Sequence, residues 1–388
     1  GYDRKNLKIP QNQEELLAEI AETVGKDHIA AISFGGAPMD FSFEKNVGAI
    51  LHMYLGGQAV GESVADLISG EVNPSGKLAE TIPFSEKDTP AWRYFAPPND
   101  DVEYRESIFV GYRYYETFHV PVKYPFGYGL SYTSFSYSEL NVPEVYSGGK
   151  IQIRFKIKNI GKVSGAEIAQ LYICPIESDV IRSHIELKGF QKIYLHPGEE
   201  KEVILELDER SFSVYDVEKK AFSMLSGKYQ ICIGASVHDL QLKANMEVVG
   251  NSYFRNEREL FPDYFREQPH GMEISAEQFY QLLGGEPKHD KEKKRGEYTV
   301  YDSYQDVVNV SMFGKFVRGV VHIGLKIILR GKSERDPAFK MVKMGVEEGN
   351  LEGLIATSGG IATPKLIDML VYNANKKYLQ AFKRLLKK

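Results

Sequence analysis

The chain has 388 residues, of which 43% are hydrophobic and 26% are charged, and its formal net charge is −5. This is an ordinary globular composition for two or three domains, and it excludes a disordered or fibrous protein. The small negative charge gives no electrostatic argument for nucleic acid as the main partner. Because no apolar run is long enough to cross a bilayer, we predict neither a spanning helix nor a membrane partner.

Residues 1–135 alternate helical and strand patterns. The chain begins at Gly1 without an initiator methionine or a signal segment, so we expect either a processed product or a piece of something longer. Apolar residues recur at helical spacing over residues 16–24, and a second helix is predicted over 58–68. Short apolar runs at 28–34 and 47–53, each followed by glycines, are typical of a buried parallel sheet. We therefore predict an α/β domain whose front end is incomplete.

The rest of this first region is predicted to contain further strands. The segment 78–84 follows a turn at 73–76 and is predicted to be the last strand of the α/β unit. After a loop that contains prolines and aspartates, residues 108–115 show a strand-like pattern. An aromatic, glycine-rich turn over 125–129 closes the unit.

Residues 138–249 show the pattern of an all-β sandwich. Apolar and polar residues alternate over 151–158, and the same alternation returns at 203–207 and 229–233. About seven short strands in about 110 residues are typical of an immunoglobulin-like or fibronectin-like domain.

Residues 250–388 differ again, with short helices separated by charged loops. Within 315–330, cations recur three or four residues apart and form a basic stripe: Lys315, Arg318, His322, Lys326 and Arg330. The stripe allows a helix that lies on a membrane surface. We favour the alternative, a helix whose apolar face packs on the body while its stripe faces water. The predicted domains are therefore 1–135, 138–249 and a helical extension over 250–388.

Motifs for bound cofactors and metals are absent from the sequence. It has no phosphate-binding P-loop, no His-Glu-x-x-His and no Cys-x-x-Cys. Its two cysteines, Cys174 and Cys232, are too few for a disulfide framework or a four-cysteine zinc site, and they indicate a reducing compartment. We expect no cofactor and no metal.

Carboxylates, aromatic residues and arginines remain as chemistry-bearing groups. They gather in predicted loops at Asp3-Arg4, at Trp92-Arg93-Tyr94 and at residues 103–106. Paired carboxylates and flat rings suit sugar hydrolysis, since one acid protonates the leaving oxygen and rings cover the apolar faces of the sugar. A loop Asp-Arg pair is more often a structural ion pair, and Trp92 is equally suited to anchoring domain packing.

The order of the longer motifs resembles glycoside hydrolase family 3, the β-glucosidase family. The resemblance covers roughly residues 1–248. The segments that carry it are Gly1 to Arg4, Leu7 to Gln13, Gly56 to Gly70, Val72 to Leu78, Tyr104 to Tyr115, Tyr124 to Thr133, Lys188 to Phe190, and Pro197-Gly198. It implies part of the family's α/β sandwich domain with a mostly parallel sheet, then a fibronectin type III-like β-sandwich, then a helical tail.

The resemblance also implies where the catalytic groups lie. Members of this architecture are similar to retaining glycosidases, with a nucleophilic Asp on a (β/α)8 barrel and an acid/base Glu shortly before the Gly-Tyr-Asp-Arg motif. Both positions are expected before Gly1, so we expect no catalytic residue in the chain. Asp3 and Arg4 would form a buried, bidentate pair that supports the acid/base loop.

Four residues of the 86–107 loop are candidates for an outer sugar subsite: Trp92, Tyr94, Tyr104 and Glu106. A purely structural role is at least as good an interpretation for each of them.

We therefore expect the C-terminal portion of a bacterial, cytoplasmic β-glucosidase-type enzyme that is inactive alone. Its expected partners are a β-linked oligosaccharide or glycoside, glucosides before xylosides, and a barrel supplied in cis or in trans. A homodimer is a further candidate assembly. The alternatives are a non-catalytic carbohydrate-binding or scaffold module and one subunit of a split glycosidase.

Overall fold

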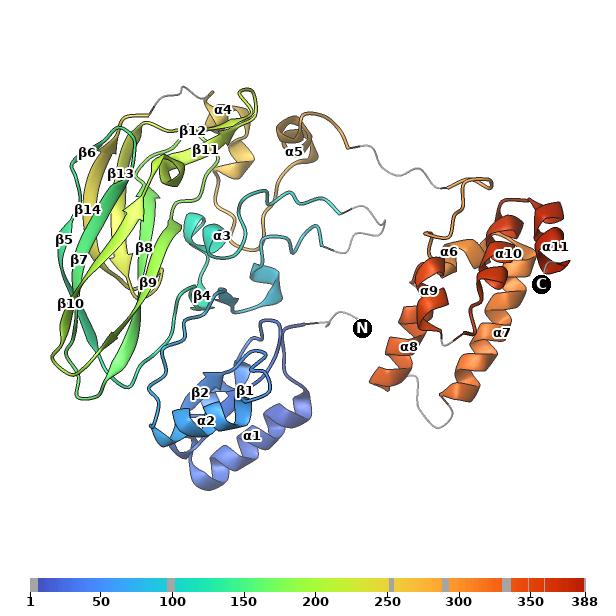
Figure 1. The fold of residues 1–388 in the computed structure, drawn as a ribbon, viewed down its shortest axis with the longest axis horizontal. Coiled ribbons are helices and arrows are strands. Elements are labelled where there is room, and N and C mark those ends of the chain that lie inside the picture. The colour runs from blue at the N-terminus through green and yellow to red at the C-terminus, as the bar shows by residue number, and fades with distance from the viewer. Residues whose placement is uncertain are drawn as a thin grey trace. The chain divides into compact units, whose positions relative to one another are not determined.

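The computed structural model describes residues 6–95, 102–250, 255–287, 293–329, 336–347, 349–358 and 360–386. They belong to two compact units, one formed by residues 6–287 and the other by residues from 288 onward. Each unit is described by itself, in the colours of Figure 1.

The first unit opens with a small α/β part. Helix α1 (Gln11–Val24) leads to strands β1 (Ala30–Ser33) and β2 (Ala49–His52), which pair in parallel, and helix α2 (Val60–Ser69) follows. The predicted helices and the predicted parallel pairing are confirmed. Gly25, with φ of 84°, ends α1 in a conformation that favours glycine.

Two predicted strands in this region differ from the structure. Only β3 (Ile82–Pro83) forms within the predicted 78–84 strand, and it pairs antiparallel with β4 (Val122–Tyr124). The predicted strand at 108–115 is wrong, because Gly111 has φ of 55° and the chain coils into helix α3 (Tyr112–Thr117). Aromatic residues give this segment the composition of a strand, and its tertiary packing makes it a helix.

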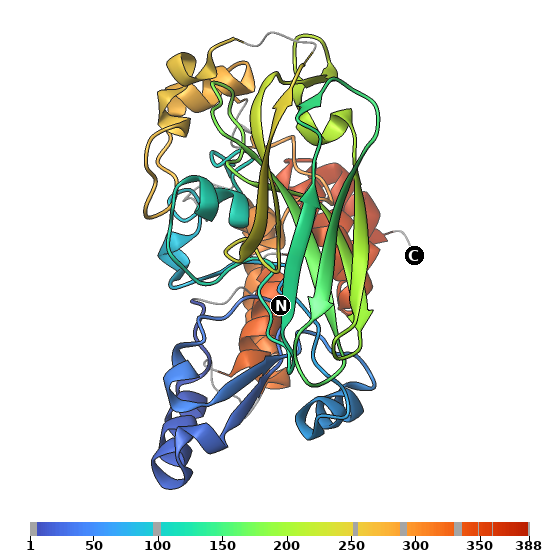
Figure 2. The same ribbon diagram turned by 90° about the vertical axis from the view of Figure 1, so that its left-hand side faces the viewer.

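A β-sandwich follows (Figures 1 and 2). One sheet has the order β10-β7-β5, the other has the order β6-β14-β13-β8-β9, and β11 and β12 form a separate hairpin. Their bounds are β5 (Phe135–Asn141), β6 (Val145–Tyr146), β7 (Ile151–Asn159), β8 (Gly165–Pro175), β9 (Glu186–Leu195), β10 (Glu200–Leu207), β11 (Ser213–Asp216), β12 (Ala221–Met224), β13 (Gly227–Gly234) and β14 (Leu240–Val248). Ile153, Phe155 and Ile157 point into the core, as the alternation in β7 predicts.

The last part of the first unit returns to the α/β region. Helices α4 (Glu257–Leu260) and α5 (Ala276–Leu283) flank a segment whose apolar residues complete a core around α3. The fully buried members of this core are Phe109, Tyr114, Phe261, Tyr264, Met272 and Ile274. Short 3₁₀ turns complete the unit: Lys26–His28, Ser42–Asn46, Glu86–Asp88, Glu209–Phe212 and Pro262–Tyr264.

The second unit is helical. Its helices are α6 (Tyr304–Asn309), α7 (Met312–Ile328), α8 (Pro337–Glu347), α9 (Leu351–Thr357), α10 (Pro364–Ala374) and α11 (Tyr378–Leu386). They share a core of their own in which Val307, Leu351 and Leu370 are buried. Among the described residues, no helix of either unit is long and apolar enough to cross a membrane. The domain boundaries at 135 and 249 stay predictions.

Candidate functional site

An open groove lies between the loop that precedes α3 and helix α5. Its volume is about 450 Å³. The residues that line it are Val102, Glu103, Tyr104, Ser107, Phe279, Leu282, Leu283 and Pro287. The groove is largely apolar, and Glu103 contributes a carboxylate to its lining.

A network around Arg105 holds this loop in place. The Arg105 guanidinium donates to Glu103 Oε2 at 2.7 Å from Nε, and to the Ile274 carbonyl at 2.8 Å from Nη1. Its carbon atom Cζ lies 4.5 Å from the centre of the Tyr94 ring, a cation–π distance. Burial disfavours the charge on Arg105, but the hydrogen bond and the attraction of Glu103 outweigh it and raise the pKa of Arg105.

Helix α5 and the segment before it close this network from the other side. Tyr280 donates from its hydroxyl to Glu103 Oε1 at 2.7 Å. The Tyr94 hydroxyl donates to the Ile274 carbonyl at 2.9 Å and accepts from the Ile274 amide at 3.0 Å. Both carboxylate oxygens of Glu103 are therefore engaged, and this fixed carboxylate orients the loop that carries Tyr104.

The structure separates the predicted sugar-binding residues. Tyr104 lies at the groove with 71% of its surface exposed, and Trp92 is 43% exposed. Tyr94 is only partly accessible and its hydroxyl is used in packing. Glu106 is 4% exposed, which favours the structural interpretation for this residue. Asp3 and Arg4 lie outside the described residues.

Glu106 is a buried carboxyl group in the loop that precedes α3. Its Oε2 atom has no hydrogen-bond partner among the described residues. Burial raises the pKa of Glu106, because the charged form loses its hydration there. Its carboxyl group therefore holds its proton to a higher pH than an exposed glutamate does.

Sequence reasoning missed the α5 residues that meet this loop, where Phe279 lines the groove and Tyr280 holds Glu103. Phe279 and Tyr280 come from the region predicted only as a helical extension, about 175 positions from the loop they contact. A local pattern carries no signal for such a distant contact. The apolar spacing of Phe279, Leu282 and Leu283 is that of a helix, but it does not indicate what this helix covers.

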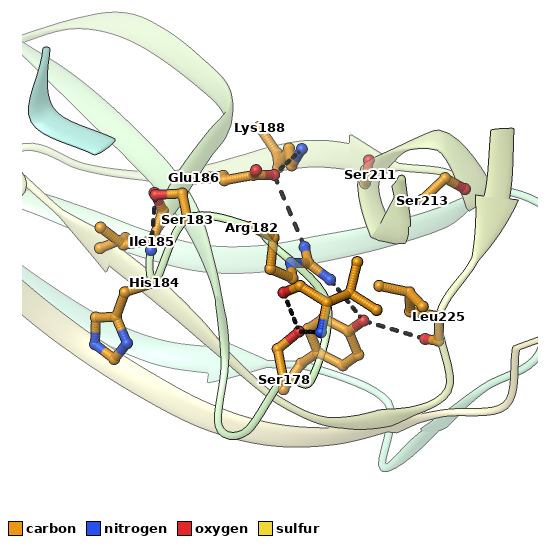
Figure 3. Close-up of polar contacts among 12 residues, drawn as sticks. Ser178, Arg182, Ser183, His184, Ile185, Glu186, Lys188, Ser211, Ser213 and Leu225 are labelled. Carbon is orange, nitrogen blue, oxygen red and sulfur yellow. Dashed lines mark hydrogen bonds and ion pairs between the residues drawn. The ribbon is translucent and has the colours of Figure 1, made fainter. Parts of the chain in front are cut away.

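The sandwich holds a second polar cluster, shown in Figure 3. Arg182 is 6% exposed and donates from Nη1 to the Tyr229 hydroxyl at 2.9 Å, and that hydroxyl donates to the Leu225 carbonyl at 3.1 Å. Glu186 Oε2 lies 3.8 Å from Arg182 Nη2 and also pairs with Lys188. The cluster ties the 178–186 loop to β13, and we assign it a structural role.

The described residues contain no cluster of three or more histidine, cysteine, aspartate or glutamate side chains that could hold a metal ion. Cys174 and Cys232 are free and buried, with their sulfur atoms 3.7 Å apart.

Comparison with known protein families shows which domains the chain contains. Residues 1–132 match the glycosyl hydrolase family 3 C-terminal domain, and residues 167–237 match the fibronectin type III-like domain. The chain contains a glycoside hydrolase family 3 C-terminal domain. The resemblance predicted from the motifs is therefore confirmed, and the sandwich is the fibronectin-like one of the two predicted types.

Individual relatives support this relationship. It is 44% identical over 250 residues to the thermostable β-glucosidase B of Acetivibrio thermocellus, a match that covers 64% of the chain and 33% of that protein. It is 37% identical to β-glucosidase BoGH3A of Bacteroides ovatus, over 64% of the chain and 34% of that protein. The chain thus spans about a third of the length of these relatives.

Solved structures of family 3 β-glucosidases match a similar share of the chain. The family 3 β-glucosidase of Bifidobacterium adolescentis gives a TM-score of 0.61 at 35% identity, covering 65% of this chain and 37% of that one. β-Glucosidase 3B of Thermotoga neapolitana, solved with α-D-glucose, gives 0.60 at 35% identity, covering 65% and 36%. Neither of the two matching family models extends beyond residue 237.

Proposed function

We propose that this chain supplies the C-terminal portion of a retaining glycosidase of the β-glucosidase type. A retaining mechanism needs two carboxyl groups about 5–5.5 Å apart. We infer that the nucleophile and the acid/base come from the portion of the family that this chain does not match, a (β/α)8 barrel present in cis or in trans. The substrates would be terminal β-linked sugars, glucosides before xylosides.

The observation that carries this proposal is the unfinished surface of the α/β part. Within the described residues, β1 and β2 pair only with each other, whereas parallel sheets are normally wider and covered on both faces. Phe34 and Leu55 follow the carboxyl ends of these two strands and are 54% and 80% exposed. Ligands of open α/β sheets bind at this edge.

Helix α1 adds to the unfinished surface. Leu16, Ile20 and Val24, one helical turn apart, are 55%, 38% and 49% exposed. An exposed apolar surface of this kind on an α/β part marks a docking site for another domain. Together with the edge at Leu55, this surface supports the proposal that the chain functions only when a complementary portion of the enzyme covers its α/β part.

The test is complementation. The purified chain is assayed with aryl β-glucoside and aryl β-xyloside, alone and after mixing with the remaining N-terminal portion of the Acetivibrio thermocellus enzyme. We expect no turnover alone and measurable turnover in the mixture. Turnover by the chain alone would place catalytic carboxylates within it and overturn the proposal.

A matched pair of variants makes the test specific. Leu55→Asp puts a charge on the exposed edge and is expected to reduce complementation about tenfold or more. Phe190→Asp changes a side chain on β9 that is 67% exposed, and we expect complementation to be unchanged. Equal loss in both variants would show that the edge at Leu55 is not the docking surface.

A second function, binding of carbohydrate without hydrolysis, is favoured by the groove. Tyr104 presents an exposed ring beside Phe279 and Leu282, and sugar faces stack on such rings. We expect cellobiose to bind the chain in titration calorimetry and Tyr104→Ala to abolish that binding. An unchanged affinity in the variant would exclude this groove.

We also propose a bacterial cytoplasmic location, supported by the free thiols of Cys174 and Cys232.

A further inference from the structure

Helix α7 has three distinct faces. Phe313, Val317 and Val321 pack into the core of the helical unit. A helix that only covers a core presents polar residues on the rest of its surface. The surface of α7 that faces away from this core carries an apolar stripe and, beside it, a row of basic residues.

The apolar half is a continuous stripe. Its five residues follow each other at intervals of three or four, which places them within roughly 80° of the helix circumference. They are Met312, Phe316, Val320, Ile323 and Ile327, with exposed fractions of 88%, 68%, 54%, 61% and 67%. Single exposed hydrophobic residues are common, whereas a row of five marks an interaction surface.

The basic half borders this stripe. Lys315, His322 and Lys326 are exposed, as is Arg318, which donates to Asn309 Oδ1 at 2.6 Å. No aspartate or glutamate occurs within Met312–Ile328. Arg330, the last cation of the predicted stripe, lies outside the described residues.

Helix α11 repeats the arrangement. It exposes an apolar stripe of Tyr378, Leu379, Phe382, Leu385 and Leu386. Its charged residues, Lys383 and Arg384, are both cations. The segment 288–388 carries 20 lysine and arginine residues against 11 aspartate and glutamate residues, although the whole chain is acidic with a net charge of −5.

We propose that the helical unit binds the surface of an anionic lipid bilayer, with the apolar stripe of α7 inserted between the lipids and its cations on the head groups. Amphipathic helices with large apolar residues on one face and Lys or Arg beside it bind membranes in this way. This inference is independent of the proposed glycosidase function. It departs from the prediction of no membrane partner, which rested on the absence of an apolar run long enough to cross a bilayer.

The charge of α7 favours an anionic bilayer over a second copy of the chain as the partner of its apolar stripe. Two α7 stripes packed together would bring two sets of cations side by side, and like charges oppose such a contact. An anionic bilayer satisfies both halves of the exposed surface at once, because it offers acyl chains to the stripe and negative head groups to the cations. The sequence analysis favoured a helix whose apolar face packs on the body while its cations face water. In the structure one apolar face of α7 packs into the core and the cations are exposed, but a second row of five apolar residues is exposed as well.

The experiment is co-sedimentation of the full chain with lipid vesicles. Vesicles of phosphatidylcholine alone are compared with vesicles that also contain phosphatidylserine, in low and in high salt. We expect binding only to the anionic vesicles, and weaker binding in high salt because salt screens the head groups. The double variants Phe316→Ser/Ile323→Ser and Lys315→Glu/Lys326→Glu should each lower the affinity about tenfold or more.

A matched control shows whether lipid binding depends on the α7 stripe itself or on any exposed apolar side chain. Phe190→Ser replaces an equally exposed phenylalanine on β9, and we expect it to bind like the parent chain. Circular dichroism and sedimentation velocity of each variant report fold and oligomeric state. Absence of binding to anionic vesicles would overturn the proposal, as would unchanged binding by both double variants. A vesicle-independent dimer that Phe316→Ser/Ile323→Ser dissociates would assign the stripe to a contact between copies.

Discussion

At the scale of single residues, the sequence identified chemical types but not the direction of side chains. Residues 103–106 were recognised as a loop with sugar-compatible groups, and within four positions the structure turns Tyr104 outward and Glu106 inward. A residue distant in sequence holds the backbone next to Glu106: Tyr264, which is buried in the α3 core, donates from its hydroxyl to the Arg105 carbonyl at 3.0 Å. No pattern local to the loop contains that information.

The first prediction concerns the charge state of Glu106. Because burial raises its pKa in the folded chain, the unfolded chain loses this proton first as pH rises, and the free energy of unfolding falls over that range. Glu106→Gln has no proton to lose. We expect it to melt at a higher temperature than the parent chain at pH 8, and to match the parent at pH 4.

Trp92, the only tryptophan, lies in the same unit, so its fluorescence reports this melting. Glu62→Gln on the exposed side of α2 is the control, with no expected difference at either pH. A variant that is less stable than the parent at pH 8 would mean that the ionised Glu106 carboxylate is stabilised in the fold.

At the scale of elements, hydrophobic periodicity predicts the secondary structure of a segment correctly where one of its faces is buried. It fails where contacts with residues distant in sequence determine the secondary structure. Strand β7 was predicted because its apolar residues alternate, and Ile153, Phe155 and Ile157 are fully buried. The segment that includes α3 is predicted as a strand from its strand-like pattern over residues 108–115. Its side chains instead form a core with residues 261–274, which the sequence does not place there.

The second prediction tests that core. Phe261 is fully buried against the α3 region, and truncation of a buried phenylalanine costs about 3–5 kcal/mol. We expect Phe261→Ala to lower the urea midpoint measured by Trp92 fluorescence and to increase hydrogen exchange over residues 109–120. Phe190→Ala, at an exposed position, should change neither. Unaltered exchange over 109–120 in Phe261→Ala would show that residues 255–287 do not stabilise α3.

At the scale of the whole molecule, the sequence predicted the order of folds and missed how the last region is divided. The predicted extension over 250–388 was treated as one part, whereas residues up to 287 belong to the first compact unit. Composition over the full chain also concealed the basic character of residues 288–388, because a net charge of −5 averages it with an acidic remainder. The α7 cations can be read from the sequence. The exposure of the apolar stripe beside them depends on which face of α7 packs into the helical core, and the sequence does not indicate that face.

The last prediction is that the helical unit unfolds as a separate cooperative body. Its buried residues contact each other within residues 298–374, and about 100 residues are enough to form a stable core. Leu370 is 1% exposed there, so Leu370→Ala should destabilise this unit by about 2–5 kcal/mol. We expect the far-UV circular dichroism of the full chain to show an earlier helical transition in this variant, while the Trp92 fluorescence transition stays where it is.

Leu379→Ala, at a position that is 79% exposed, should move neither transition. A parallel shift of both transitions in Leu370→Ala would mean that the two units unfold as one, since a defect confined to the helical core reaches Trp92 only if the two cores are thermodynamically coupled.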